Sequence, residues 1–308
     1  NMDKAMTYAQ RLADRLETEQ PDTSAHAEAL LRLGLLQARQ EDHAAAVASI
    51  ESAVEIMSFL QIDAALVRAM TDLGIVLENA TRYDSALSQF ASAADLSRKI
   101  DLPELRAAQY LHMGRIYDLR LSRYAKAIDS YQNALTIYRE TEDHEKTAEA
   151  LVNIGRCHRL MGNFSEADHY YGQAVERLDD PGEGPSFLHL TVLLEQANNA
   201  WFQGRYEEAF RSQRRVYRGA EAGQYAGLQV MALNTSGLIW WTLGNFDRAL
   251  AELNQALKAA ENLKVRQDWF TVIRETMKRP WRCLTALWPL IRPWAPSGAL
   301  RMTTATRA

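Results

Sequence analysis

The chain is poor in cysteine, in proline and in long apolar runs, and its charge is nearly balanced. Two cysteines, Cys157 and Cys283, stand far apart in 308 residues, which excludes a disulfide framework or a structural zinc site. With 35 basic and 39 acidic residues, the chain lacks the positive surplus typical of nucleic-acid binding. No apolar run reaches the roughly 18 residues that span a bilayer, and no secretory core is visible. We therefore expect a cytoplasmic protein with no nucleic-acid partner and no membrane span.

Proline is missing from three long stretches, residues 22–102, 104–180 and 186–279, whereas alanine is abundant. The 46 alanines favour helices, because an alanine side chain loses no rotamer entropy when a helix forms. No bounded run alternates apolar and polar residues as a half-buried strand does. The sequence therefore predicts an all-α protein.

A repeat with a period of 40 to 42 residues organises the chain, and its units begin at residues 27, 67, 107, 148, 190 and 230. The eighth position is always small: Gly34, Gly74, Gly114, Gly155, Ala197 and Gly237. The twentieth position is alanine in all six units when one extra residue is allowed for in the turn of the third unit: Ala46, Ala86, Ala127, Ala167, Ala209 and Ala249. Six alanines in six units would arise by chance with a frequency on the order of 10⁻⁵, so the repeat is real.

Each unit is predicted to hold two helices joined by a short turn. The small residues mark the point where the two helix axes cross closely, and larger residues fill the space around it. Glycine in the turn permits a left-handed helix exit, and the aromatic residue two positions later packs back onto the pair. These turns read Gly162-Asn163-Phe164, Gly204-Arg205-Tyr206 and Gly244-Asn245-Phe246.

This pattern resembles the tetratricopeptide repeat, in the long form found in kinesin light chains and bacterial regulators. The match is carried by Leu151-Val152-Asn153-Ile154-Gly155, Gly162-Asn163-Phe164, Ala167, Tyr171 and Ala174, and it extends from residue 27 to about residue 263. The resemblance implies an α-solenoid, a right-handed superhelix of antiparallel helix pairs. We expect six repeats preceded by an orphan N-terminal helix.

Three parts are expected along the chain. Residues 1–26 are expected to form a capping helix or half repeat, so that the array starts in mid-repeat, either with a capping helix or as a fragment of a longer protein. Residues 27–269 hold the six repeats, which are 27–66, 67–106, 107–147, 148–189, 190–229 and 230–269. Residues 181–185, Pro-Gly-Glu-Gly-Pro, are expected to form a flexible linker between repeats.

Residues 270–308 read as a degenerate or non-native basic tail. From residue 276 onwards there are six basic residues, three tryptophans and four prolines but no Asp or Glu. Residues 1–275 then hold all 39 acidic residues and 29 of the 35 basic ones, so the array is acidic. One interpretation of the tail is a segment that docks on this acidic array or lies on a membrane surface. The other is an out-of-frame reading of a GC-rich gene, which produces this composition.

The resemblance implies that the concave face, lined by the first helices, binds a peptide or helix of a partner protein. Arg115, Arg156 and Arg159 would hold acidic groups, because a guanidinium pairs with a carboxylate through two hydrogen bonds. Trp201 and Trp241 would anchor an apolar side chain. The full set of predicted groove residues is His112, Arg115, Asn153, Arg156, Arg159, Asn198, Trp201, Asn234 and Trp241.

Other interpretations stay open at this stage. The arginines could instead pair with Asp118 or Glu149 inside the array, while the tryptophans fill gaps between helix pairs. A ligand-sensing regulatory domain of a larger bacterial signalling or transcription protein is the alternative function. No two of the seven histidines have the helical spacing of a metal site, and no nucleophile has a placed partner. The sequence therefore predicts neither an enzyme nor a metal or cofactor site.

Overall fold

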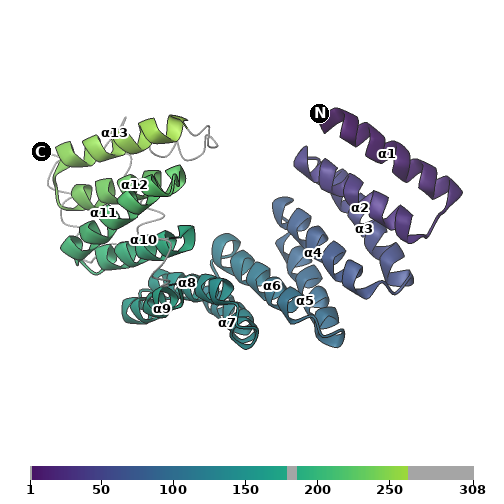
Figure 1. Ribbon diagram of the computed structural model, residues 1–308, viewed down its shortest axis with the longest axis horizontal. Helices are drawn as coiled ribbons and strands as arrows, with labels where there is room; N and C mark the ends of the chain where they lie inside the picture. Colours follow the sequence, from purple (N-terminus) through teal and green to yellow (C-terminus); the bar gives the residue numbers. More distant parts are fainter. Residues whose placement is uncertain (1, 179–185, 263–308) are drawn as a thin grey trace, which may run out of the picture. The chain divides into compact units, whose positions relative to one another are not determined.

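The computed structural model describes residues 2–178 and 186–262, and they fold as successive α-helices (Figure 1). Over these ranges the helices are α1 (Met2–Glu19), α2 (Ser24–Arg39), α3 (His43–Phe59), α4 (Asp63–Asn79), α5 (Tyr83–Lys99), α6 (Pro103–Arg115), the π-helical turn η1 (Ile116–Arg120), α7 (Tyr124–Glu140), α8 (His144–Leu160), α9 (Phe164–Leu178), α10 (Phe187–Phe202), α11 (Tyr206–Ala222), α12 (Ala226–Thr242) and α13 (Phe246–Asn262). The predicted all-α, solenoid fold class is confirmed. The predicted linker at 181–185 and the predicted tail at 270–308 lie outside the described residues.

The chain divides into two compact units, Asn1–Cys157 and His158–Ala308, and the division falls within α8. In the described part of the first unit, the consecutive helices α1 to α7 pack against one another in chain order (Figure 1). In the second unit the same holds from α9 to α13. Helix α1 buries Ala9 and Ala13 against Ala29 and Leu33 of α2, as expected for an orphan helix that covers the first pair.

In the first, second, third and sixth repeats, the eighth-position glycine lies against a large side chain of the second helix. A Cβ atom added at Gly34 or Gly74 would lie 2.5 Å from Ile50 or 2.6 Å from Phe90. Carbon atoms do not approach this closely, so a larger residue would force the two helices apart. The same relation joins Gly114 to Tyr131 in the third repeat, which confirms the predicted crossing point.

Every described turn between helices passes through one residue with a positive φ angle. Gly162, Gly204 and Gly244 take this conformation at φ values of 83°, 76° and 75°, as predicted from the sequence. The remaining described turns use polar residues: Asp22, Glu41, Gln61, Thr81, Asp101, Ser122, Glu142 and Gln224. The turn geometry is therefore common to the repeats, although glycine supplies it in only some of them.

The extra residue of the third repeat lies in a helix and not in the turn, where the sequence analysis placed it. Over η1 the hydrogen bonds span five residues, and the amide of Leu121 donates to the carbonyl of Ile116 at 3.1 Å. A π-helical turn accommodates one residue more than an α-helical turn of the same length. The following turn therefore keeps three residues, 121–123, as its counterpart at 80–82 does.

Candidate binding surface

The first unit places the predicted residues His112 and Arg115 on α6. The His112 ring stacks on the Phe90 ring with centroids 4.9 Å apart. Burial lowers the pKa of His112, the positive charge of Arg115 lowers it further, and Glu78 opposes them in part. The imidazole is therefore neutral at neutral pH, whereas Arg115 is exposed and makes no ion pair with another described residue. Asn153, one of the predicted groove residues, is buried on α8.

Arg156 is paired inside the first unit. Its Nη2 atom lies 2.5 Å and its Nε atom 3.1 Å from Oδ2 of Asp118, whose side chain is only 1% exposed. A neighbouring pair joins Arg120 to the buried Glu78 at 3.1 Å. Both pairs connect the first helix of one repeat to that of the next. Of the two interpretations left open by the sequence, internal pairing with Asp118 holds for Arg156.

Arg159, in the second unit, is also paired internally. Its Nη2 atom lies 2.9 Å from Oε2 of Glu195, and the two side chains are 11% and 13% exposed. Burial alone would lower the pKa of the guanidinium, but Glu195 and Tyr171 raise it, and the net shift is upward. The guanidinium also lies 5.5 Å from the Phe202 ring centroid, in a cation–π contact. Its acidic partner is neither of the two that the sequence favoured.

The two predicted tryptophans lie near the ends of α10 and α12 in the second unit, and both are half-buried. The Trp201 indole N–H donates to the hydroxyl of Thr242 at 3.2 Å, and its ring lies 4.9 Å from that of Phe202. The Trp241 ring contacts Phe246 edge-on, with centroids 4.9 Å apart. These contacts fix both indole rings while leaving part of each accessible.

Polar and apolar side chains accompany these rings on the same two helices. Asn198 on α10 and Asn234 on α12 are half-buried, and neither amide has a hydrogen-bond partner among the residues that the structure describes. Leu243 and Phe246, beside the end of α12, are exposed. An exposed apolar patch with nearby amides is the composition of a protein interaction surface.

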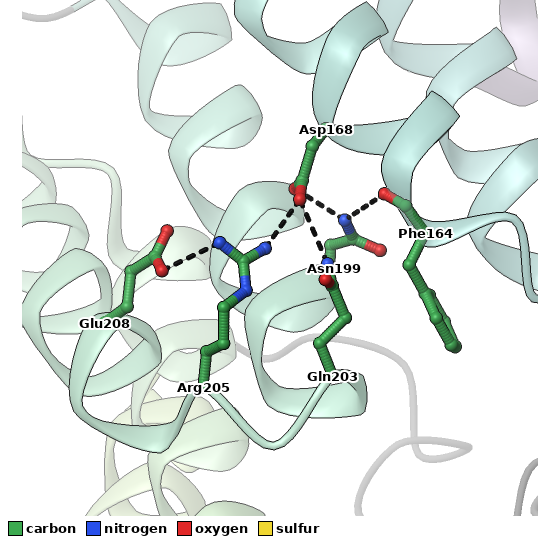
Figure 2. Close-up of polar contacts among 6 residues, drawn as sticks. All are labelled: Phe164, Asp168, Asn199, Gln203, Arg205 and Glu208. Atoms are coloured by element: carbon green, nitrogen blue, oxygen red, sulfur yellow. Dashed lines mark hydrogen bonds and ion pairs between the residues drawn. The ribbon is translucent and has the colours of Figure 1, made fainter.

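The structure also contains a polar network that the sequence analysis missed (Figure 2). Asp168 on α9 accepts hydrogen bonds from Asn199 at 2.6 Å, from Gln203 at 3.0 Å and from Arg205 at 2.6 Å. The amide of Asn199 also donates to the carbonyl oxygen of Phe164 at 2.9 Å. We call these five residues the Asp168 network, and they join α9 to α10 and the start of α11.

The Asp168 network occupies a position where other repeats have apolar contacts. Asp168 is the twenty-first residue of its repeat, and Asn199 is the tenth residue of the next one. The equivalent pairs share apolar clusters: Val47 with Val76, Leu87 with Ile116, and Phe210 with Ile239. The departure of two positions from the apolar pattern is the sequence signal that could have revealed the network.

Two general findings concern residues 2–178 and 186–262. Within these ranges no three His, Cys, Asp or Glu side chains are grouped so that they could hold a metal ion. In the same part of the chain, no helix combines the length and the apolar character required to cross a membrane.

Comparison with curated proteins gives partial matches. Superkiller complex protein 3 of Mus musculus is 27% identical over 162 residues, which are 53% of this chain and 9% of that protein. Outer dynein arm-docking complex subunit 4 of Danio rerio is 26% identical over 125 residues, 41% of this chain and 25% of that protein. The aligned part thus spans a quarter or less of these relatives.

Solved structures share the fold at low sequence identity. A STAND protein of Pyrococcus horikoshii with a tetratricopeptide repeat sensor gives a TM-score of 0.67 at 16% identity, over 94% of this chain and 42% of that one. The apo form of RapI gives a TM-score of 0.60 at 15% identity, over 86% of this chain and 93% of RapI. A putative kinesin light chain of Podosopora anserina gives a TM-score of 0.55 at 16% identity, over 65% of this chain and 98% of that one.

The family models that match the chain are all described as tetratricopeptide repeat. They cover residues 3–58, 104–180 and 232–263, together more than half of the chain. These segments include parts of both units and contain the crossing glycines Gly34 and Gly114 and the turn glycines Gly162 and Gly244. The chain belongs to the tetratricopeptide repeat family.

Proposed function

We propose that the chain is a protein-interaction scaffold that binds a peptide or helix of a partner protein on the face formed by α10 and α12. One observation carries this proposal: Trp201 and Trp241 are held in place by neighbouring side chains but remain partly accessible. Tryptophan is enriched among the residues that dominate binding energies, because it buries a large area while few torsions are fixed. An apolar side chain of the partner packs against these two rings.

The asparagines near the tryptophans supply hydrogen bonds to the partner. Asn198 and Asn234 each carry a carbonyl oxygen and an amide nitrogen, so each can accept from and donate to a peptide backbone. Backbone bonds of this kind hold a segment without demanding particular side chains. The apolar anchor then sets the position of the segment along the two helices.

An acidic group of the partner is proposed to bind Arg115 in the first unit as a separate contact. Arg156 and Arg159 already hold Asp118 and Glu195, so their positive charges are largely compensated within the chain. Arg115 is exposed and lies beside the neutral His112, so its charge is available. The proposed preference for an acidic partner therefore rests on one arginine and not on three.

The experiment is a crosslinking pull-down from the source cell with the full chain as bait, followed by affinity measurement with the recovered segment. Alanine at Trp201 and Trp241 together is expected to weaken binding by about 30-fold or more. Trp201→Phe preserves the ring contact with Phe202 but removes the N–H donor, so it should have a smaller effect. Tyr8→Ala, on the exposed face of α1, is the matched control. If the double variant binds the segment with unchanged affinity, the face formed by α10 and α12 is not the binding site.

The alternative function is a ligand-sensing domain of a larger signalling or transcription protein. It is supported by the fold similarity to the STAND protein with a tetratricopeptide repeat sensor. A sensor would bind a small molecule without a partner peptide, so thermal stabilisation of the full chain by a metabolite library separates the two proposals. For the compartment we propose the cytoplasm, because the chain has only two cysteines and they stand far apart in the sequence.

A further inference from the structure

A second accessible surface lies on the second helices of the first unit, away from the first helices discussed above. Glu51, Glu55 and Phe59 follow one another at intervals of four residues and therefore share one face of α3. The Phe59 side chain is 78% exposed. A phenylalanine this exposed gains nothing from the packing of its own repeat.

The other repeats do not require an aromatic residue at this position. Phe59 is the thirty-third residue of its repeat, and its counterparts are Lys99, Glu140, Asp180, Ala222 and Asn262. Glu51 is the twenty-fifth residue, and no other repeat has an acidic residue there: the counterparts are Ala91, Gln132, Gly172, Arg214 and Asn254. The combination is specific to the first repeat, and the repeat architecture does not explain it.

The same residues line a groove of about 500 Å³ between α3 and α5. Its apolar surface comes from Val54, Leu73 and Phe59, and Gln89 of α5 lies across from α3. This volume is sufficient for one or two apolar side chains. Because Phe59 is one of the lining residues, an entering side chain can contact the aromatic ring as well.

The two charged residues that line the groove, Glu51 and Glu55, are both acidic. Helix α3 contains Glu51 and Glu55 but neither lysine nor arginine. Neither glutamate makes an ion pair with any residue in the described ranges. A partner that places positive charge here gains attraction, whereas a negatively charged partner is repelled.

From this combination we infer that the α3–α5 groove docks a basic segment of a partner protein. An apolar side chain of that segment enters the groove against Val54 and Phe59. Lysine or arginine residues on either side of it pair with Glu51 and Glu55. Because the glutamates are exposed, their contribution to affinity is modest and falls as salt rises.

The test selects peptides from a displayed library of random 12-residue sequences on the immobilised full chain. The part of α3 that lines the groove, Glu51 to Phe59, is about 13 Å long, so a 12-residue peptide can cover it. Selected peptides are expected to contain an apolar residue flanked by lysine or arginine. The affinity of the best peptide is then measured by fluorescence anisotropy for the wild type, for Glu51→Lys with Glu55→Lys, and for Phe59→Ser. Glu207→Lys with Glu221→Lys, on α11, changes the net charge equally and is the matched control.

Charge reversal at Glu51 and Glu55 is expected to weaken binding by about tenfold at low salt. A peptide with its basic residues replaced by glutamate should bind the reversed variant better than the wild type. Phe59→Ser should weaken binding at low and at high salt alike, because its contact is apolar.

Three results would overturn this inference, and they are independent of the proposed function. The first is that the selected peptides lack basic residues or bind the charge-reversed variant as well as the wild type. The second is that alanine at Trp201 and Trp241 abolishes their binding, which would place them on the α10–α12 face. The third is a change from dimer to monomer in Phe59→Ser, which would assign the groove to a second copy of the chain.

Discussion

At the scale of single residues, the paired arginines hold the repeats together. Asp118 is almost completely removed from water, and a buried carboxylate is stable only when an opposite charge and hydrogen bonds replace the solvent. Arg156 supplies both from the next repeat. Glu195 and Arg159 stand in the same relation in the second unit. These side chains are therefore part of the interface between repeats.

Substitution Arg156→Met should lower the free energy of unfolding by about 3 kcal/mol, because it leaves Asp118 buried without a partner. Urea unfolding followed by circular dichroism measures this change. Adding Asp118→Leu should recover most of the loss, since the uncompensated charge is then gone. Arg32→Met, at an exposed position that forms only a surface pair with Glu28, is the control. If Arg156→Met behaves like the control, the buried pair contributes little.

His112 should make the first unit sensitive to acid. Its pKa is lowered in the folded chain by burial and by Arg115, partly opposed by Glu78, whereas the unfolded value lies near 6.5. As the pH falls through that value, the unfolded chain takes up a proton that the folded imidazole resists, so stability decreases. His112→Phe preserves a ring against Phe90 and removes this proton uptake.

Thermal midpoints of the wild type and His112→Phe, compared across a pH series below neutrality, provide the measurement. The wild type should lose more stability on acidification than the variant. The variant should keep some sensitivity to acid, because burial also lowers the pKa of His158, although Glu166 partly opposes this shift. Parallel curves for the two proteins would show that His112 is not responsible.

At the scale of elements, the contact between α9 and α10 differs in kind from the equivalent contacts in other repeats. Asn199 is completely buried and offers its amide to Asp168 and Phe164, where other repeats bury only apolar groups. The Asp168 side chain is 37% exposed, so only the Asn199 end of the network is fully buried. Replacing such a polar pair by apolar residues of similar size is often close to neutral, whereas removing the buried member alone is not. Comparing these two kinds of substitution therefore tests how the Asp168 network contributes to stability.

The double substitution Asp168→Leu with Asn199→Ile restores the residue types that other repeats use. It should match the wild type in stability or exceed it by no more than about 1 kcal/mol, because Asp168 is only partly buried. Arg205 loses one partner but retains Glu208 at 2.8 Å. Asn199→Ile alone should cost about 2 kcal/mol, because it removes a donor from Asp168. The urea midpoints of the wild type, the double variant and Asn199→Ile measure these changes. Equal losses of stability in the two variants would contradict the prediction.

The repeat pattern predicted the helix pairs because the same steric demand recurs in each unit. At Gly74, for example, no larger residue fits against Phe90, so the sequence records the contact directly. The π-helical turn was not predictable, because an extra residue between Gly114 and Tyr131 has the same sequence signature in a helix as in a turn. The partner of Arg159 was also missed, since several acids lie at suitable distances along the chain and only the stacking of repeats selects Glu195.

At the scale of the whole molecule, stability is distributed in separate apolar clusters. One cluster in the first unit joins Ile50, Phe90 and Ile116, whereas another in the second unit joins Leu193 and Val216. Repeat arrays of this kind are stabilised by contacts between neighbours, so local damage need not spread along the chain. The two units should therefore respond separately to a local defect.

Gly74→Ala should open the first unit while leaving the second protected. The added methyl group would meet the Phe90 ring, and overpacking of this kind costs about 1 to 3 kcal/mol. Hydrogen exchange followed by mass spectrometry should show faster exchange in α4 and α5 but not in α12 and α13. Gly172→Ala, whose added Cβ meets no atom within 4 Å, is the control and should slow exchange in α9. Faster exchange throughout both units would indicate a single cooperative fold.

The π-helical turn η1 shows how an array of this kind tolerates a change in chain length. One residue added to an α-helix rotates all later side chains by about 100° around the axis, so the apolar face would turn away from its neighbour. Widening a single turn absorbs the added residue before α7 begins, and Ala127 and Tyr131 remain buried. A single-codon insertion at this position therefore alters one helical turn and leaves the phase of every later repeat unchanged.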